Sequence, residues 1–97
     1  MEITVANNSE VTIIGHIKTI EDYQKIKQAL NSIIANGLKK ITINIPESIT
    51  MTSSVIGYML KLVFENKLDL SILVKDEKLF NLLDVLNLVE VFKVKKM

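Results

Sequence analysis

Alternating strand and helix patterns predict an α/β fold for this chain of 97 residues, with a mostly parallel sheet covered by helices. In several short segments, hydrophobic and polar residues alternate, as in half-buried strands. Between those segments, hydrophobic residues recur every three or four positions, as in helices that pack one face on a core. Turn residues separate the segments, and the order is ββαβαβαβ. Short joins favour right-handed crossovers between parallel strands, after an antiparallel N-terminal hairpin.

The first two segments predict that hairpin. Ile3–Ala6 is a short apolar run, and the polar cluster Asn7-Asn8-Ser9 follows it as a turn. Val11, Ile13 and Ile17, which alternate with polar residues, form the predicted second strand.

A helix is predicted to begin after Thr19, because Asp22 three residues later completes a capping box. Its apolar positions at helical spacing are Ile20, Tyr23, Ile26, Leu30, Ile33 and Ile34. Asn36-Gly37 ends the helix, since glycine readily adopts the left-handed conformation of a helix end.

Ile41, Ile43 and Ile45 predict the next strand, which stops at Pro46 because proline has no amide hydrogen to donate. After a polar loop, the hydroxyl cluster Thr52-Ser53-Ser54 predicts the start of a second helix. The core face of that helix carries Val55, Ile56, Met59, Leu60 and Val63.

The last third of the chain predicts a strand at Leu68–Val74 and a third helix capped by Asp76. Leu79, Phe80, Leu83 and Leu86 share one side of this helix, and Asn87 ends it. Val89–Val94 is predicted as a last short strand, with Lys95-Lys96-Met97 as a tail in solvent.

Composition predicts a single domain over residues 1–97, with 48% hydrophobic and 24% charged residues. No apolar run reaches the roughly 18 residues that a membrane span needs, so we expect no membrane insertion. The N-terminus lacks the features of a secretory signal, and there is no cysteine. We therefore expect a cytoplasmic protein.

Nucleic acid is not expected as a partner. The formal net charge is +1, and all 12 basic residues are lysine. The guanidinium fork that reads guanine edges and grips phosphates is therefore missing.

The candidate catalytic groups have structural explanations. His16 is the only histidine and lacks partners for a metal site or a catalytic base. The pairs Glu21-Asp22 and Asp76-Glu77 fall in first turns of helices, where negative charge is stabilised. Three glycines lie too far apart for a phosphate-binding loop: Gly15, Gly37 and Gly57. We expect no enzyme, no metal and no cofactor.

The cluster Thr52-Ser53-Ser54 is the most informative stretch for function. Hydroxyls before a helix usually act as caps. A phosphate at this position would meet the positive end of the helix dipole and free amide hydrogens, so the fold could tolerate it. A docking surface could therefore be switched off there without unfolding the domain. Met51 and Met59 flank the cluster, and methionine suits either a binding surface or a core.

Nearly the whole chain resembles the STAS family (sulfate transporter and anti-sigma factor antagonist). Ile41–Ile45, the loop, and Met51-Thr52-Ser53-Ser54-Val55-Ile56-Gly57 are similar to the family's strand, loop and Asp-Ser-Ser-Gly-Leu-Gly helix start. Gly15-His16-Ile17, Leu68–Val74 and Leu79–Leu88 resemble its second strand, fourth strand and last helix. Two positions differ from the motif: Thr52 replaces the aspartate, and Val55 replaces the glycine after the second serine.

The resemblance implies a regulatory binding module. In anti-sigma factor antagonists of this family, the second serine is phosphorylated by an anti-sigma factor that is itself a serine kinase. Only the unphosphorylated antagonist binds that anti-sigma factor. That serine corresponds to Ser54, with Ser53 as the alternative. The implied partner is an anti-sigma factor or a related serine kinase-fold protein. The implied partner-binding residues are Met51, Thr52, Ser53, Ser54, Val55 and Tyr58.

Other functions stay open at this point. The altered motif also fits an accessory STAS subunit that supports the ATPase of a lipid-transport ABC complex, without phosphorylation. A small enzyme built around His16 is a third class. The oligomeric state is open as well, a homodimer included.

Overall fold

The computed structural model, which describes residues 1–97, contains one mixed sheet of five strands. The strands are β1 (Glu2–Ala6), β2 (Glu10–Ile14), β3 (Lys40–Ile45), β4 (Asp69–Val74) and β5 (Val94–Lys96). Their order in the sheet follows the chain from β1 to β5. The pair β1 and β2 is antiparallel, and the other three pairs are parallel. The predicted α/β fold with an antiparallel N-terminal hairpin is confirmed.

Alternation along the strands buries one side of the sheet. Val11, Ile43, Ile72 and Val94 are register partners in neighbouring strands, and all four are buried. The next residue along each strand points to the opposite side, because side chains alternate with a period of two. That second row consists of Thr12, Asn44, Leu73 and Lys95. It is mostly polar, so the hydrophobic core lies on one side of the sheet only.

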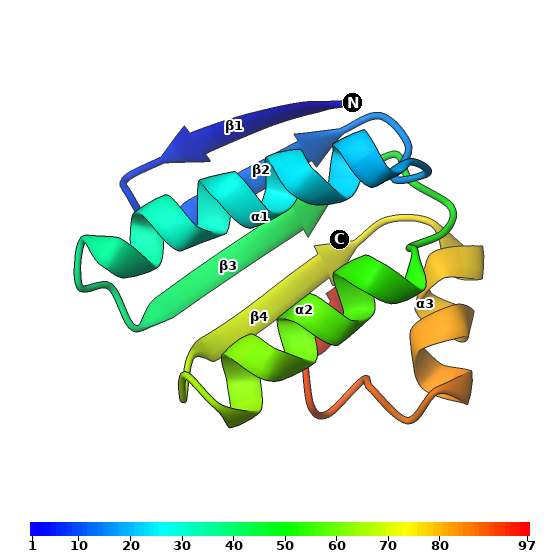
Figure 1. Cartoon of the computed structure of the whole chain (residues 1–97). Coiled ribbons are helices and arrows are strands. Elements are labelled where there is room, and N and C mark those ends of the chain that lie inside the picture. Colours follow the sequence, from blue (N-terminus) through cyan, green and yellow to red (C-terminus); the bar gives the residue numbers. More distant parts are fainter.

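Three helices cover the buried side: α1 (Ile20–Ala35), α2 (Ser53–Phe64) and α3 (Glu77–Val85). Because successive parallel strands are neighbours in the sheet, right-handed crossovers return each helix to the same side. Figure 1 shows α1 and α2 side by side over the sheet, with α3 beyond the end of β4. Between helices and sheet lies a core of 23 buried residues. No helix combines the length and the apolar character that crossing a membrane requires.

The predicted helix ends are confirmed. Thr19 Oγ1 accepts a hydrogen bond from the Asp22 amide at 3.1 Å, and Asp22 Oδ2 accepts one from the Thr19 amide at 3.0 Å. Asp76 Oδ1 accepts from the Lys78 amide at 2.8 Å. Gly37 and Asn87 follow α1 and α3 with φ angles of 89° and 61°. These local patterns are therefore sufficient to place the helices.

The last predicted strand is wrong in position. β5 begins at Val94, where Val89–Val94 was expected, and Lys95 and Lys96 belong to it instead of forming a tail. Residues 90–93 form turns, because Phe92 turns inward and is fully buried. The apolar residues of this segment thus belong to a loop that packs on the core, although their spacing is also typical of a strand.

The second predicted strand is too long, because β2 ends at Ile14 and does not reach Ile17. Gly15 follows with a φ angle of 93°, a conformation that favours glycine and turns the chain away from the sheet. Ile17 is nevertheless fully buried. Its position in the core is set by contacts with the loop between β3 and α2.

That loop is attached to the end of β2 by two hydrogen bonds. Glu47 Oε1 accepts from the Gly15 amide at 3.0 Å, and Ser48 Oγ accepts from the Ile17 amide at 3.0 Å. The Ser48 hydroxyl donates to the Thr50 carbonyl at 2.7 Å. Ser48 is the only polar side chain among the buried residues, and its hydrogen bonds satisfy it. The start of α2 is therefore held against the neighbouring strand.

Replacement of Ser48 by alanine should destabilise the domain. The buried Ile17 amide would lose its acceptor, which costs about 1–3 kcal/mol. Urea unfolding followed by circular dichroism measures this loss. Ser32→Ala, at an exposed position of α1, is the matched control and should change stability by less than about 0.5 kcal/mol. Equal stability of the two variants would contradict the anchoring role of Ser48.

Candidate functional site

The start of α2 exposes two serine side chains. Thr52 is the N-cap, and its Oγ1 accepts a hydrogen bond from the Val55 amide at 3.3 Å. Ser53 and Ser54 are exposed, and neither hydroxyl forms a hydrogen bond within the protein. The first turn holds no acidic residue. The amino end of this helix therefore keeps its positive partial charge uncompensated, next to two free hydroxyls.

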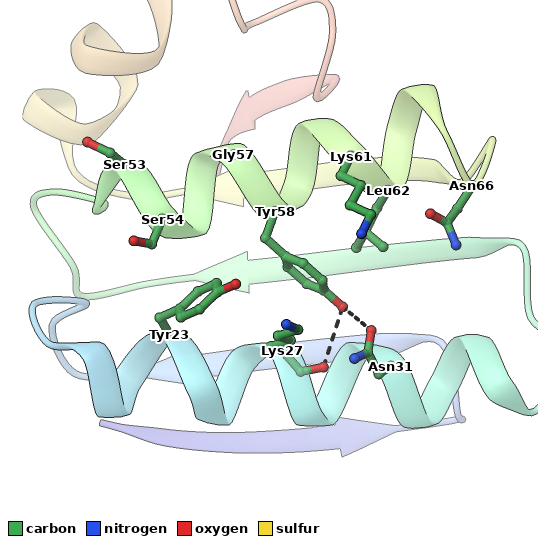
Figure 2. Close-up of a pocket in the computed structure, with 10 residues that line it drawn as sticks. All are labelled: Tyr23, Lys27, Asn31, Ser53, Ser54, Gly57, Tyr58, Lys61, Leu62 and Asn66. Carbon is green, nitrogen blue, oxygen red and sulfur yellow. Dashed lines mark hydrogen bonds between the residues drawn. The ribbon is translucent and has the colours of Figure 1, made fainter.

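The two serines point in different directions. Figure 2 shows the Ser53 side chain pointing away from α1, whereas Ser54 points toward α1 and Tyr23. Ser54 also lines a small hollow of about 80 Å³ with Lys18, Thr19, Ile20, Tyr23 and Thr52. Ile20 is 71% exposed beside this hollow, and Ile49 in the preceding loop is 43% exposed. Two exposed apolar side chains thus belong to the segments around the serine pair: Ile20 beside the hollow that Ser54 lines, and Ile49 in the loop before α2.

Two residues predicted at the docking surface lie in the core instead. Met51 is 5% exposed and Val55 is fully buried, because both point from the start of α2 toward the sheet. The expectation that they contact a partner is therefore corrected. Tyr58 is 8% exposed. Of the predicted set, Thr52 is partly exposed and acts as the cap, and Ser53 and Ser54 are accessible.

A groove of about 470 Å³ runs from the serine pair along the contact between α1 and α2. Its ten lining residues are Tyr23, Lys27, Asn31, Ser53, Ser54, Gly57, Tyr58, Lys61, Leu62 and Asn66 (Figure 2). Sequence reasoning missed Lys27, Asn31 and Lys61. The spacing of Tyr23, Lys27 and Asn31 by four residues places them on one side of α1, which is a readable signal. Which helix that side meets is set only by the fold.

Tyr58 connects the two helices across the groove. Its hydroxyl donates to Asn31 Oδ1 at 2.5 Å, with the Lys27 carbonyl oxygen at 3.4 Å. The Tyr23 ring meets the Tyr58 ring edge to face, with centroids 6.2 Å apart, and Lys27 Nζ lies 5.8 Å from the Tyr23 centroid. Burial, and secondarily the charge of Tyr23, raise the pKa of Tyr58 to about 12. The Tyr58 hydroxyl therefore stays protonated and donates.

The other titratable candidates have structural positions. The pKa of Asp22 is lowered by hydrogen bonds, first of all from the Lys18 amide, as expected for a capping carboxylate. His16 is exposed at the turn after β2. No group of three or more His, Cys, Asp or Glu side chains is arranged to hold a metal ion.

Comparisons of the chain with family models, with curated proteins and with solved structures find no match. The structure itself defines the chain as an α/β domain with a five-stranded mixed sheet, three helices and an exposed serine pair beside a polar groove.

Tyr58 should titrate far above an ordinary tyrosine. In a Tyr23→Phe variant it is the only tyrosine, and absorbance of the folded protein should show a midpoint well above 10, because burial, the larger cause of the raised pKa, is retained. In urea the midpoint should fall to about 10. Since the folded state holds this proton more tightly, stability should decrease as pH rises from about 10 to about 12. Tyr58→Phe should remove that part of the decrease, and a folded-state midpoint near 10 would contradict the burial of this hydroxyl.

Proposed function

We propose that this chain is a non-enzymatic regulatory module that docks onto an anti-sigma factor or a related serine kinase-fold protein. The docking surface is the start of α2 with the loop before it. The observation that carries the proposal is the pair Ser53 and Ser54, exposed and without hydrogen-bond partners at a helix end that is otherwise capped and packed. The loop carries exposed Ile49 as an apolar contact for the partner, and Ile20 lies next to Ser54.

The structural roles of Thr52 and Val55 support the resemblance to the STAS motif. Threonine and aspartate are both good N-caps, so Thr52 performs the capping that an aspartate would perform. The Val55 side chain is buried and adds no bulk at the surface beside Ser54. Both departures from the motif are therefore compatible with a serine that a kinase can reach.

A phosphate on Ser54 fits the switch that we propose. It would add a charge of about −1.5 to −2 near the amino end of α2, where the helix dipole favours it. The domain would stay folded, because Ser54 contributes no hydrogen bond to the fold and its side chain is exposed. The docking surface itself would gain this negative charge. Phosphorylation would thus end binding without unfolding the module.

The kinase assay tests this proposal. The protein is incubated with ATP and a candidate anti-sigma factor of the serine kinase class, and phosphopeptides are mapped by mass spectrometry. Phosphate should appear on Ser54, persist in Ser53→Ala and disappear in Ser54→Ala. Phosphorylated protein should lose binding to the kinase. No binding and no phosphate on either serine would reject the proposal, and recovery of a transporter ATPase from native cells would favour the accessory-subunit alternative.

The apolar contacts can be tested separately from the serine. Ile49→Asp and Ile20→Asp should each weaken partner binding about tenfold or more, because a charge would replace an apolar contact in the interface. Isothermal titration calorimetry measures the affinity. Val85→Asp is the matched control, since Val85 is 79% exposed on α3 and outside the proposed surface. Equal affinity of all three variants would place the docking surface elsewhere.

A further inference from the structure

The polar groups of the groove between α1 and α2 are mainly hydrogen-bond donors. Lys27 and Lys61 bring two positive charges, and no carboxylate lines the groove. Figure 2 shows both ammonium groups in the space between the helices. Ser54 brings a free hydroxyl at one end of the groove, whereas the Ser53 side chain points away from α1 (Figure 2). The groove therefore presents donors and positive charge without any negative counterpart.

The contact with Tyr58 orients the Asn31 amide toward the same space. Asn31 Oδ1 is occupied by the Tyr58 hydroxyl at 2.5 Å. The Nδ2 group, which carries the two donor hydrogens, forms no hydrogen bond within the protein and lies on the side of Lys27 (Figure 2). In this arrangement the hydroxyl donates to the amide oxygen, which leaves the two Nδ2 hydrogens without an acceptor in the protein. Asn31 thus lines the groove with two donor hydrogens that the protein does not use.

Neither lysine of the groove has an ionic partner. The two ion pairs of the protein are Lys93 with Asp69 and Lys96 with Glu77, and neither pair lines the groove. Glu65 lies one turn after Lys61 and does not pair with it. Lys61 is in the last turn of α2, where a positive charge is favourable in any case, but Lys27 is in the middle of α1. The ammonium group of Lys27 has no ionic partner, and its contact in the protein is the Tyr23 ring, whose centroid lies 5.8 Å away.

We propose that this groove binds a phosphate group between Lys27 and Lys61, with the Asn31 amide as an additional donor. A phosphate is acceptor-only when fully ionised, so it complements a groove of donors. The groove volume of about 470 Å³ also leaves room for a small molecule that carries the phosphate. Two sources share this chemistry: a free phosphomonoester, or a phosphoryl group on Ser54. The second source rests on the proposed function, since it requires phosphorylated Ser54.

The second source would explain how a phosphate on Ser54 is held. The Ser54 side chain points toward α1, and it lines the same groove as both lysines. A phosphoryl group bound by Lys27 would neutralise the groove and lie across the gap between the helices. The phosphate would then be part of a fixed surface instead of a mobile one. A partner that needs the open groove would be excluded by occupancy as well as by charge.

Nuclear magnetic resonance can test the free phosphomonoester. Amide spectra of the unphosphorylated protein are recorded during titration with inorganic phosphate and with O-phosphoserine, at constant ionic strength set with chloride. Shifts should be confined to the groove and include the Asn31 side-chain amide. The double variant Lys27→Gln with Lys61→Gln should weaken binding about tenfold or more. Lys25→Gln with Lys78→Gln removes the same charge outside the groove and should change the affinity less than about twofold.

The second arm tests the phosphoryl group on Ser54. Phosphoserine is incorporated at position 54 during translation, so that no kinase and no partner is required. Phosphorus resonance titration measures the second pKa of the phosphate, which is about 6 in isolation. Lys27 and Lys61 should lower it by about half a unit or more, and their double glutamine variant should restore it. The Lys25 and Lys78 control should leave the lowered value unchanged.

The two arms separate the sources. Saturable binding of free phosphate that depends on the groove lysines supports a phosphomonoester ligand, and a lowered pKa that depends on them supports phosphorylated Ser54. The proposal is overturned if the double glutamine variant is folded but changes neither the affinity for free phosphate nor the second pKa of the phosphate on Ser54. That result would leave the docking function untouched, because neither arm involves a partner.

Discussion

One side of β2, β3 and β4 packs against α1 and α2, and the position of the candidate site depends on that one-sided contact. Successive parallel strands are neighbours in the sheet, so every crossover returns to the same side. As a result, α1 and α2 lie side by side and run in the same direction (Figure 1). Their amino ends are at the same edge of the sheet, and the groove follows their contact. If successive crossovers had passed on opposite sides of the sheet, α1 and α2 would lie on different sides and would not touch.

The serine pair is exposed because its surroundings are fixed. Ser48 and Glu47 hold the loop to the end of β2, Thr52 caps α2, and Val55 packs into the core. The backbone before and after the serines is held in place, whereas the side chains of Ser53 and Ser54 are exposed and form no hydrogen bond within the protein. Binding and modification sites are commonly built in this way, on loops that a rigid scaffold positions.

The groove differs from the β5 edge of the sheet in its charge pairing. Around β5, lysines meet carboxylates: Lys93 pairs with Asp69, and this partner lowers the pKa of the exposed Asp69 carboxyl. In the groove, Lys27 and Lys61 meet only hydroxyls, amides and tyrosine rings. Buried Tyr58 uses its protonated hydroxyl to orient Asn31, so the polar groups of both helices face one space. This difference in charge pairing is the physical basis for the phosphate site that we propose in the groove.

The sequence alone was sufficient for the fold class, the three helices and the exposed hydroxyls at the start of α2. These features depend on local chemistry, such as the capping pair Thr19 and Asp22 or the alternation of Ile41, Ile43 and Ile45. The tertiary structure decided which apolar residues belong to the core and which polar residues meet. Phe92 is drawn into the core and shifts the last strand, Met51 and Val55 are buried, and Lys27 faces Lys61 across the groove. The burial of a side chain, and the placement of residues 34 positions apart on one groove, depend on how whole helices pack. Periodicity within a single segment does not specify that packing.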